Sequence, residues 1–66
     1  MKAGSVVRLA QGVYNHFKLE SFIAVLVKKI PRKDSLEYDW LVLADGRFIE
    51  LGRQIEQSAE LISEIR

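Results

Sequence analysis

The dipeptide Asp45-Gly46 separates two strand-like runs, residues 36–44 and 47–51. A two-residue hairpin loop needs positive φ angles, and an Asp-Gly pair adopts them at little steric cost. The two runs are therefore predicted to pair as antiparallel strands around this turn. This hairpin therefore predicts a β fold.

Two further segments have the composition of strands. Residues 4–9 alternate, with Val7 and Leu9 on one face. Residues 22–30 are rich in Ile and Val, and their first half is apolar on both faces before Pro31 ends the run. Both faces must then be covered, by a bend of the strand between two sheets, by the preceding loop or by a second subunit.

The connection between these two strands, residues 10–21, has no clean period. It contains four sizeable apolar residues: Val13, Tyr14, Phe17 and Leu19. Because four such side chains should not all remain in water, we predict an irregular loop that folds back onto the body of the protein. A single helical turn is the alternative.

The C-terminal segment, residues 53–65, fits two patterns. One helical face would carry three apolar residues, Ile55, Ala59 and Ile62. A short strand after one turn at residues 53–57 would instead alternate through Ala59, Leu61 and Ile65. The pattern slightly favours the helix, but a fifth strand would help to close an open sheet edge. We predict an all-β, five-stranded barrel with a short 3₁₀ turn before the last strand, with four strands plus a C-terminal helix as the alternative.

The small size of the chain limits how it can be stabilised. It has 66 residues, is interpreted as one domain over residues 1–66, and at this size buries only about 60% of its unfolded surface. The absence of cysteine excludes disulfides and thiolate zinc sites, and a lone His16 cannot build a His-based zinc site. We expect no metal or cofactor. Two ways to stabilise so small a chain remain, association with a partner and a well-packed barrel core, and the sequence favours neither over the other.

Charge is unevenly distributed although the formal net charge is only +1. Residues 1–33 hold seven Lys or Arg against Glu20 alone, and residues 34–66 hold eight Asp or Glu against three Arg. A fold that separates these halves would have a basic and an acidic side, suited to head-to-tail assembly or anion binding, whereas a barrel can interleave them. Apolar runs are too short for a membrane span or signal core, so we expect a cytoplasmic protein.

Five pieces follow one another along the chain: GSVVRL, SFIAVLVKKIP, EYDWLVLADGRFIEL, GRQIEQ and SAELI. In this order, with a long loop after the first, they resemble the small SH3-like barrel. The Gly-x-x-Val-x-Leu start and the W-x-V strand before an Asp-Gly turn, here Trp40, Val42, Asp45 and Gly46, are similar to short uncharacterised proteins of tailed phages, including marine cyanophages. That resemblance implies the host cytoplasm or the virion as location. The Sm-like barrel, which forms rings and binds RNA, is the structural competitor, but this chain lacks an obvious N-terminal helix.

An inventory of reactive side chains favours a protein without enzyme activity. His16 has no Ser or Cys nucleophile beside it in the sequence, and the four glycines are scattered rather than gathered in a phosphate loop. Glu37 and Asp39 share one face of a strand, but such carboxylate pairs usually lie on the solvated surface. Trp40, in the middle of an apolar strand, is predicted to lie in the core.

Two binding surfaces are predicted. A basic cluster at the end of the second strand could neutralise phosphates, although acidic residues follow it directly: Lys28, Lys29, Arg32 and Lys33. An apolar surface could receive a partner or a second copy: Tyr14, Phe17, Phe22, Ala24 and Leu26. The leading hypothesis is a non-enzymatic interaction or assembly module that self-associates or docks onto a larger protein, with an SH3-like or Sm-like nucleic-acid binder as the alternative. No membrane or small-molecule substrate is expected.

Overall fold

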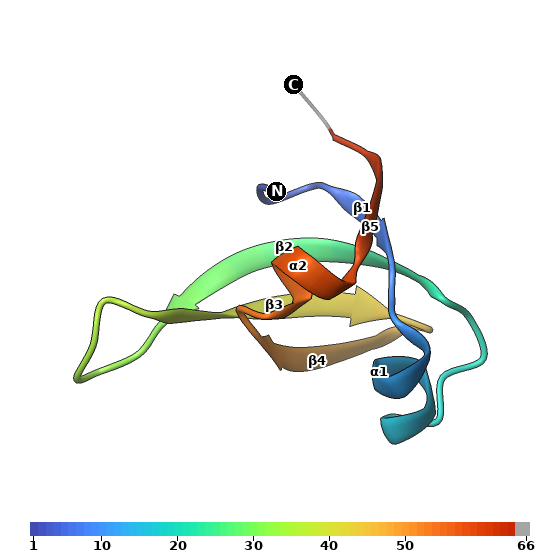
Figure 1. The fold of residues 1–66 in the computed structure, drawn as a ribbon, viewed down its shortest axis with the longest axis horizontal. Coiled ribbons are helices and arrows are strands. Elements are labelled where there is room, and N and C mark those ends of the chain that lie inside the picture. The colour runs from blue at the N-terminus through green and yellow to red at the C-terminus, as the bar shows by residue number, and fades with distance from the viewer. Residues whose placement is uncertain (65–66) are drawn as a thin grey trace.

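A computed structural model describes residues 1–64 and shows a mostly β chain with two short helical turns (Figure 1). The elements in chain order are β1 (Val6–Arg8), α1 (Gln11–His16), β2 (Ile23–Pro31), β3 (Tyr38–Ala44), β4 (Arg47–Gly52), α2 (Ile55–Ser58) and β5 (Glu60–Ser63). The five strands form one antiparallel sheet in the order β4-β3-β2-β1-β5. The predicted strand number is therefore confirmed.

The predicted hairpin joins β3 to β4. Asp45 and Gly46 have φ angles of 56° and 74°, as a primed two-residue turn requires. Ala44 pairs with Arg47 directly beside the turn. The turn is also tied to the α1–β2 connection, because the Arg47 guanidinium donates to the Phe17 carbonyl oxygen at 2.7 Å and Asp45 accepts from the Glu20 backbone N–H at 3.0 Å.

The prediction of a closed barrel is wrong, because β4 and β5 are the two edges of an open sheet. Closure fails because the N- and C-terminal strands are short. β1 pairs only with Ile23–Val25 of β2, and β5 pairs with β1 across a register shift between Val6 and Val7. The rest of β2 contacts β3 alone within the sheet, so β5 never reaches β4.

The C-terminal segment is a turn followed by a strand, so the alternative of four strands plus a C-terminal helix is wrong. The turn is one turn of α-helix rather than the predicted 3₁₀ turn: the Ser58 and Ala59 N–H groups donate to carbonyl oxygens four residues earlier, at 3.1 and 2.8 Å. Leu61 lies in β5 as the alternating pattern predicted. Ile65, the last residue of that pattern, lies outside the described residues.

Residues 10–21 are more regular than the predicted loop. Gln11–His16 form α1, and Lys18, with φ of 53°, ends it in a left-handed conformation. The Leu19 N–H then donates to the Tyr14 carbonyl oxygen at 3.1 Å, which is a Schellman-type helix end. The prediction that the apolar side chains fold back is confirmed, because Leu19 is buried and the other three pack against the core.

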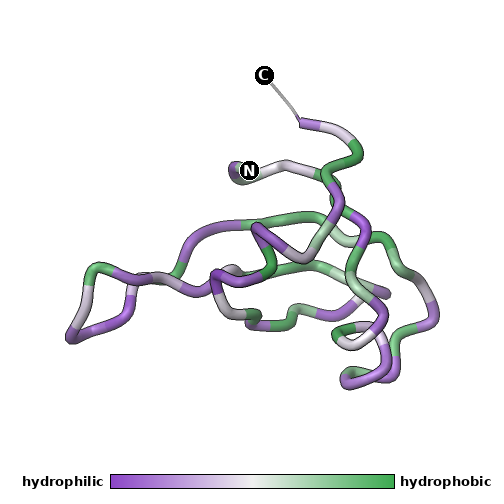
Figure 2. Tube along the Cα trace, viewed as in Figure 1, coloured by the Kyte–Doolittle hydropathy of each residue, from purple (hydrophilic) through white to green (hydrophobic). Residues whose placement is uncertain are grey.

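The core lies on one face of the sheet, between the strands and the two helical turns. It is built from alternate strand residues and from apolar residues of the connections: Val7, Leu9, Leu19, Ala24, Leu26, Trp40, Val42, Ala44, Ile49, Leu51 and Ile55. Trp40 is fully buried, as predicted. Figure 2 shows that the β2–β3 loop is mostly hydrophilic, unlike the strands that it joins. Within residues 1–64, no helix is long and apolar enough to cross a membrane.

Candidate interaction surface

The face of the sheet opposite the core carries apolar side chains that remain exposed. Val25, Leu43 and Phe48 are direct cross-strand partners on β2, β3 and β4, so they form one row across the sheet. Phe48 is 67% exposed, Leu43 is 37% exposed and Val25 is half-buried. Ile23, two residues before Val25, and Leu41, two before Leu43, extend the same face along the strands. We call these five residues the outer-face patch.

Charged residues flank the patch on both sides of β3. Lys28 on β2 and Glu50 on β4 are the cross-strand partners of Leu41, which lies between them. Both are exposed, and neither forms an ion pair with another residue of the described segment 1–64. Arg8, the partner of Ile23 on β1, approaches Glu60 at 3.8 Å. The patch therefore has a base on its β2 side and an acid on its β4 side.

The opposite face holds a polar cluster that joins α2 to β3. The Tyr38 hydroxyl donates to the Glu56 carboxylate at 2.5 Å, and the Trp40 indole N–H donates to the same group at 3.1 Å. The ammonium of Lys29 lies 4.6 Å from the Tyr38 ring centroid, within cation–π distance. Tyr38 also meets Trp40 edge-to-face, with ring centroids 6.0 Å apart. Each polar group of the cluster has a partner, so we interpret the cluster as a structural contact that holds α2 against β3, and we call it the clamp.

The hydrogen bonds in this clamp shift two pKa values in opposite directions. The Tyr38 hydroxyl is the main cause that lowers the pKa of Glu56, and the Trp40 indole and the Lys29 charge act in the same direction against the effect of burial. The hydrogen bond to Glu56 likewise raises the pKa of Tyr38, because losing the proton would set two negative charges side by side. Both groups are thus held in the protonation states that form the clamp.

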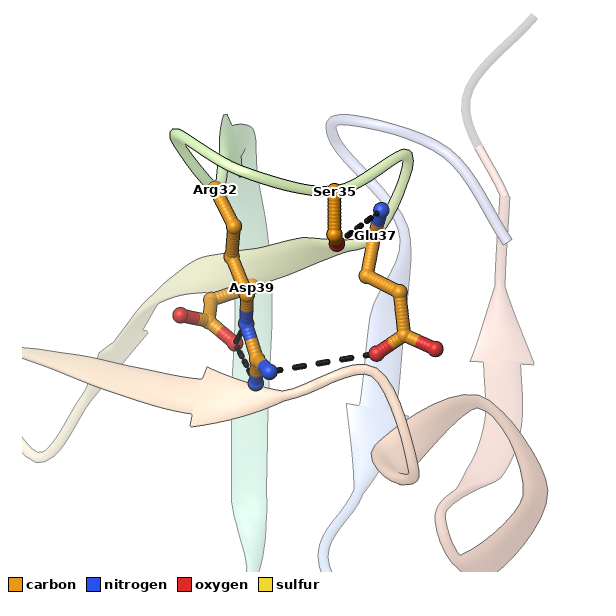
Figure 3. A network of polar contacts seen from close by, with 4 residues as sticks. All are labelled: Arg32, Ser35, Glu37 and Asp39. Atoms are coloured by element: carbon orange, nitrogen blue, oxygen red, sulfur yellow. Dashed lines mark hydrogen bonds and ion pairs between the residues drawn. The ribbon is translucent and has the colours of Figure 1, made fainter.

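A second polar network orders the β2–β3 loop (Figure 3). The Arg32 guanidinium donates to Asp39 at 2.7 and 3.1 Å and lies 3.8 Å from a Glu37 oxygen. Ser35 accepts from the Glu37 backbone N–H at 2.8 Å. The hydrogen bond to Asp39 raises the pKa of Arg32. A polar depression of about 160 Å³ beside this network is lined by Arg32, Glu37, Arg53, Gln54 and Gln57.

The basic residues predicted to contact nucleic acid do not form one patch. The sheet register shifts at Val27, so Lys28 pairs with Leu41 on the outer face while Lys29 lies over the Tyr38 ring on the core side. Arg32 is bound to Asp39 and Glu37. Lys33 is exposed in the loop and forms no ion pair with another of residues 1–64. The structure thus divides the four cations among different surroundings.

The apolar surface predicted for a partner is also divided. Ala24 and Leu26 lie in the core of this chain, so they are not available to a partner. Phe22 stacks on Tyr14 with ring centroids 4.0 Å apart and stays partly exposed, and Phe17 packs against the core. The sequence showed that β2 is apolar on both faces, but it did not show which face is covered by the chain itself. The face of β2 that we predicted for a partner is the one that α1 and the following loop cover.

None of the five residues of the outer-face patch is in the surface predicted from the sequence, and Leu43 and Phe48 are the most telling omissions. The signal was present, because Leu41 and Leu43 alternate with the predicted core residue Trp40, and Phe48 follows the hairpin turn at the matching register. His16 is exposed and contacts Phe17 edge-to-face. Over the part of the chain that the structure describes, no three His, Asp or Glu side chains gather where they could hold a metal ion.

Comparison with known proteins gives no further guide to function. No family model, no curated protein and no solved structure matches this chain. The findings therefore identify no family. The similarity to phage proteins stays a prediction that depends on the short motifs around Gly4 and Trp40.

Proposed function

We propose that this chain is a non-enzymatic assembly module that self-associates through the outer-face patch. The observation that carries the proposal is the row Val25, Leu43 and Phe48, in which Val25 is half-buried while Leu43 and Phe48 remain exposed. Single exposed apolar residues are ordinary, but cross-strand neighbours form a continuous surface, which is typical of interaction sites.

The energetics of a small open sheet support this function. Removing apolar surface from water stabilises by about 25 cal/mol per Å², and a chain of 66 residues has a small core of its own. A second sheet packed on the outer face would cover Leu43 and Phe48 and turn the open sheet into one layer of a sandwich. Self-association would thus supply the cover that the chain lacks.

Nucleic-acid binding is the second candidate. The division of the basic cluster between two faces, and the ion pairs of Arg32, weaken the local positive field that this function needs. Salt-dependent binding of single-stranded RNA or DNA that is lost when Lys28, Lys29, Arg32 and Lys33 are replaced by Ala would favour it over self-association.

A phage origin, with the virion or the host cytoplasm as location, is proposed from the sequence motifs alone. It is compatible with an assembly role. The position of the gene tests it: neighbours that encode capsid or tail proteins would support this origin. A chromosomal position among unrelated metabolic genes would count against it.

The assembly function is tested by measuring mass against concentration. Light scattering from roughly 1 μM to roughly 1 mM should show a monomer that converts to a larger species. The variant Phe48→Ser should stay monomeric over a wider range. Leu36→Ser is the matched control, because Leu36 is fully exposed in the β2–β3 loop and lies outside the patch. A wild-type chain that stays monomeric throughout, or equal behaviour of both variants, would remove this function.

A further inference from the structure

Two rows of cross-strand partners define the outer face. One row is apolar, with Val25, Leu43 and Phe48 on β2, β3 and β4. The next row runs Lys28, Leu41, Glu50 over the same strands, so it is basic at one end and acidic at the other. β3 is the centre of both rows. The charge of this second row is therefore antisymmetric about β3.

We propose that the occupant of the outer face is a second copy of this chain, related by a two-fold axis that runs approximately along β3. This inference rests on the proposed self-association and specifies its geometry. Rotation about that axis exchanges the β2 and β4 sides, so Lys28 faces Glu50 of the partner subunit and Val25 faces Phe48 of the partner subunit. Leu41 and Leu43 each meet their own counterparts at the axis.

The dimensions of stacked sheets allow these contacts. Packed sheets lie about 10 Å apart, so a Lys and a Glu that extend from opposite sheets can meet between them. A two-fold interface repeats every contact, so the dimer contains two Lys28–Glu50 pairs, one on each side of the apolar centre. Within one chain, Lys28 and Glu50 are kept apart by β3, which agrees with the lack of an ion pair between them in residues 1–64.

Charge distinguishes this axis from the perpendicular one. An axis across the strands through Leu43 would set Val25 and Phe48 each against its own counterpart. It would also turn Lys28 toward the end of β2 that holds Ile23, beside Arg8 of the partner subunit. That arrangement separates Lys28 from Glu50 and sets it beside Arg8, a like charge, which disfavours it.

Charge reversal tests the geometry. Lys28→Glu and Glu50→Lys should each weaken self-association by at least about tenfold, because each places like charges opposite one another twice. The double variant Lys28→Glu/Glu50→Lys should associate about as well as the wild type. A mixture of the two single variants should form a heterodimer, because all its cross-interface pairs are then of opposite sign. Circular dichroism and thermal unfolding of every variant establish that each is folded.

The outcomes separate this inference from the proposed function. Association that is weakened by Phe48→Ser but is unchanged by both charge reversals, or is not restored in the double variant, would overturn the two-fold axis along β3 and leave the assembly function in place. Association that survives Phe48→Ser and is lost when backbone pairing at β4 is blocked would overturn both, because it would show edge-to-edge pairing. A wild type that never associates overturns both as well.

Discussion

Replacing Glu56 with Ala should destabilise the fold strongly, since this one carboxylate accepts hydrogen bonds from two aromatic side chains. The Trp40 indole N–H and the Tyr38 hydroxyl both donate to it. Trp40 is fully buried at the centre of the core, and Glu56 lies on α2, so the contact also holds α2 against β3. Among the described residues, the indole N–H donates to Glu56 alone, so Glu56→Ala leaves a buried donor unpaired.

The size of the expected loss of stability follows from the free energy that an unpaired buried polar group costs. Leaving a buried donor without its charged acceptor costs about 1 to 3 kcal/mol, and losing the second bond raises the expected total for Glu56→Ala to about 2 to 4 kcal/mol. A chain of 66 residues has a typical stability of roughly 3 to 10 kcal/mol. Glu56→Gln keeps an acceptor oxygen and should cost about 1 kcal/mol. Gln57→Ala, at an exposed position of the same turn, should change stability by less than about 0.5 kcal/mol.

Urea unfolding followed by circular dichroism measures these differences, and the fluorescence of Trp40, the only tryptophan, gives a second probe. We expect the order of stability to be wild type and Gln57→Ala, then Glu56→Gln, then Glu56→Ala. If Glu56→Ala unfolds at the same urea concentration as Gln57→Ala, the clamp does not stabilise the fold and the reasoning from the buried indole is refuted.

Three further predictions concern stability. Because the pKa of Glu56 is lowered in the fold, its contribution is present above the ordinary carboxyl pKa and is lost as the pH falls through the lowered value. The difference in unfolding free energy between wild type and Glu56→Gln should therefore shrink on acidification; a constant difference from about pH 6 to about pH 3 would contradict this. The raised pKa of Tyr38 adds stability that is present below about pH 10 and is lost above it. Gly46→Ala should destabilise by about 1 kcal/mol, because Gly46 has a φ angle of 74°, whereas Gly12→Ala in α1, where an added Cβ meets open space, should be neutral or stabilising by up to about 1 kcal/mol. Equal effects of the two glycine substitutions in thermal unfolding would refute the assignment of the turn.

The parts of the fold that could be predicted from the sequence are those fixed by local chemistry. Asp45-Gly46 dictates its turn whatever surrounds it, and the alternation of Val7 and Leu9 identifies a core face. Closure of the sheet could not be predicted in the same way, because it depends on whether β5 and β4 meet in space. The choice between helix and strand after residue 53 was ambiguous, since both periods fit the same apolar residues.

The candidate surface could be predicted only in part, for two physical reasons. A strand that is apolar on both faces does not reveal which face its own chain covers, so Ala24 and Leu26 were assigned to the surface although they lie in the core. Simple alternation also places Lys28 with Leu26 on the core face, whereas the register shift at Val27 moves Lys28 to the outer face. The charged row with Glu50 exists only because of that shift.

The central claim, a two-fold sandwich of outer faces, is tested most directly by nuclear Overhauser contacts between differently labelled copies. In a mixed sample above the association concentration, an isotope-filtered spectrum should show the Val25 methyl groups of one copy close to the Phe48 ring of the other. Within one chain these residues are separated by β3. Intermolecular contacts that instead run along the edge of β4, or their absence from a sample that light scattering shows to be associated, would contradict the claim.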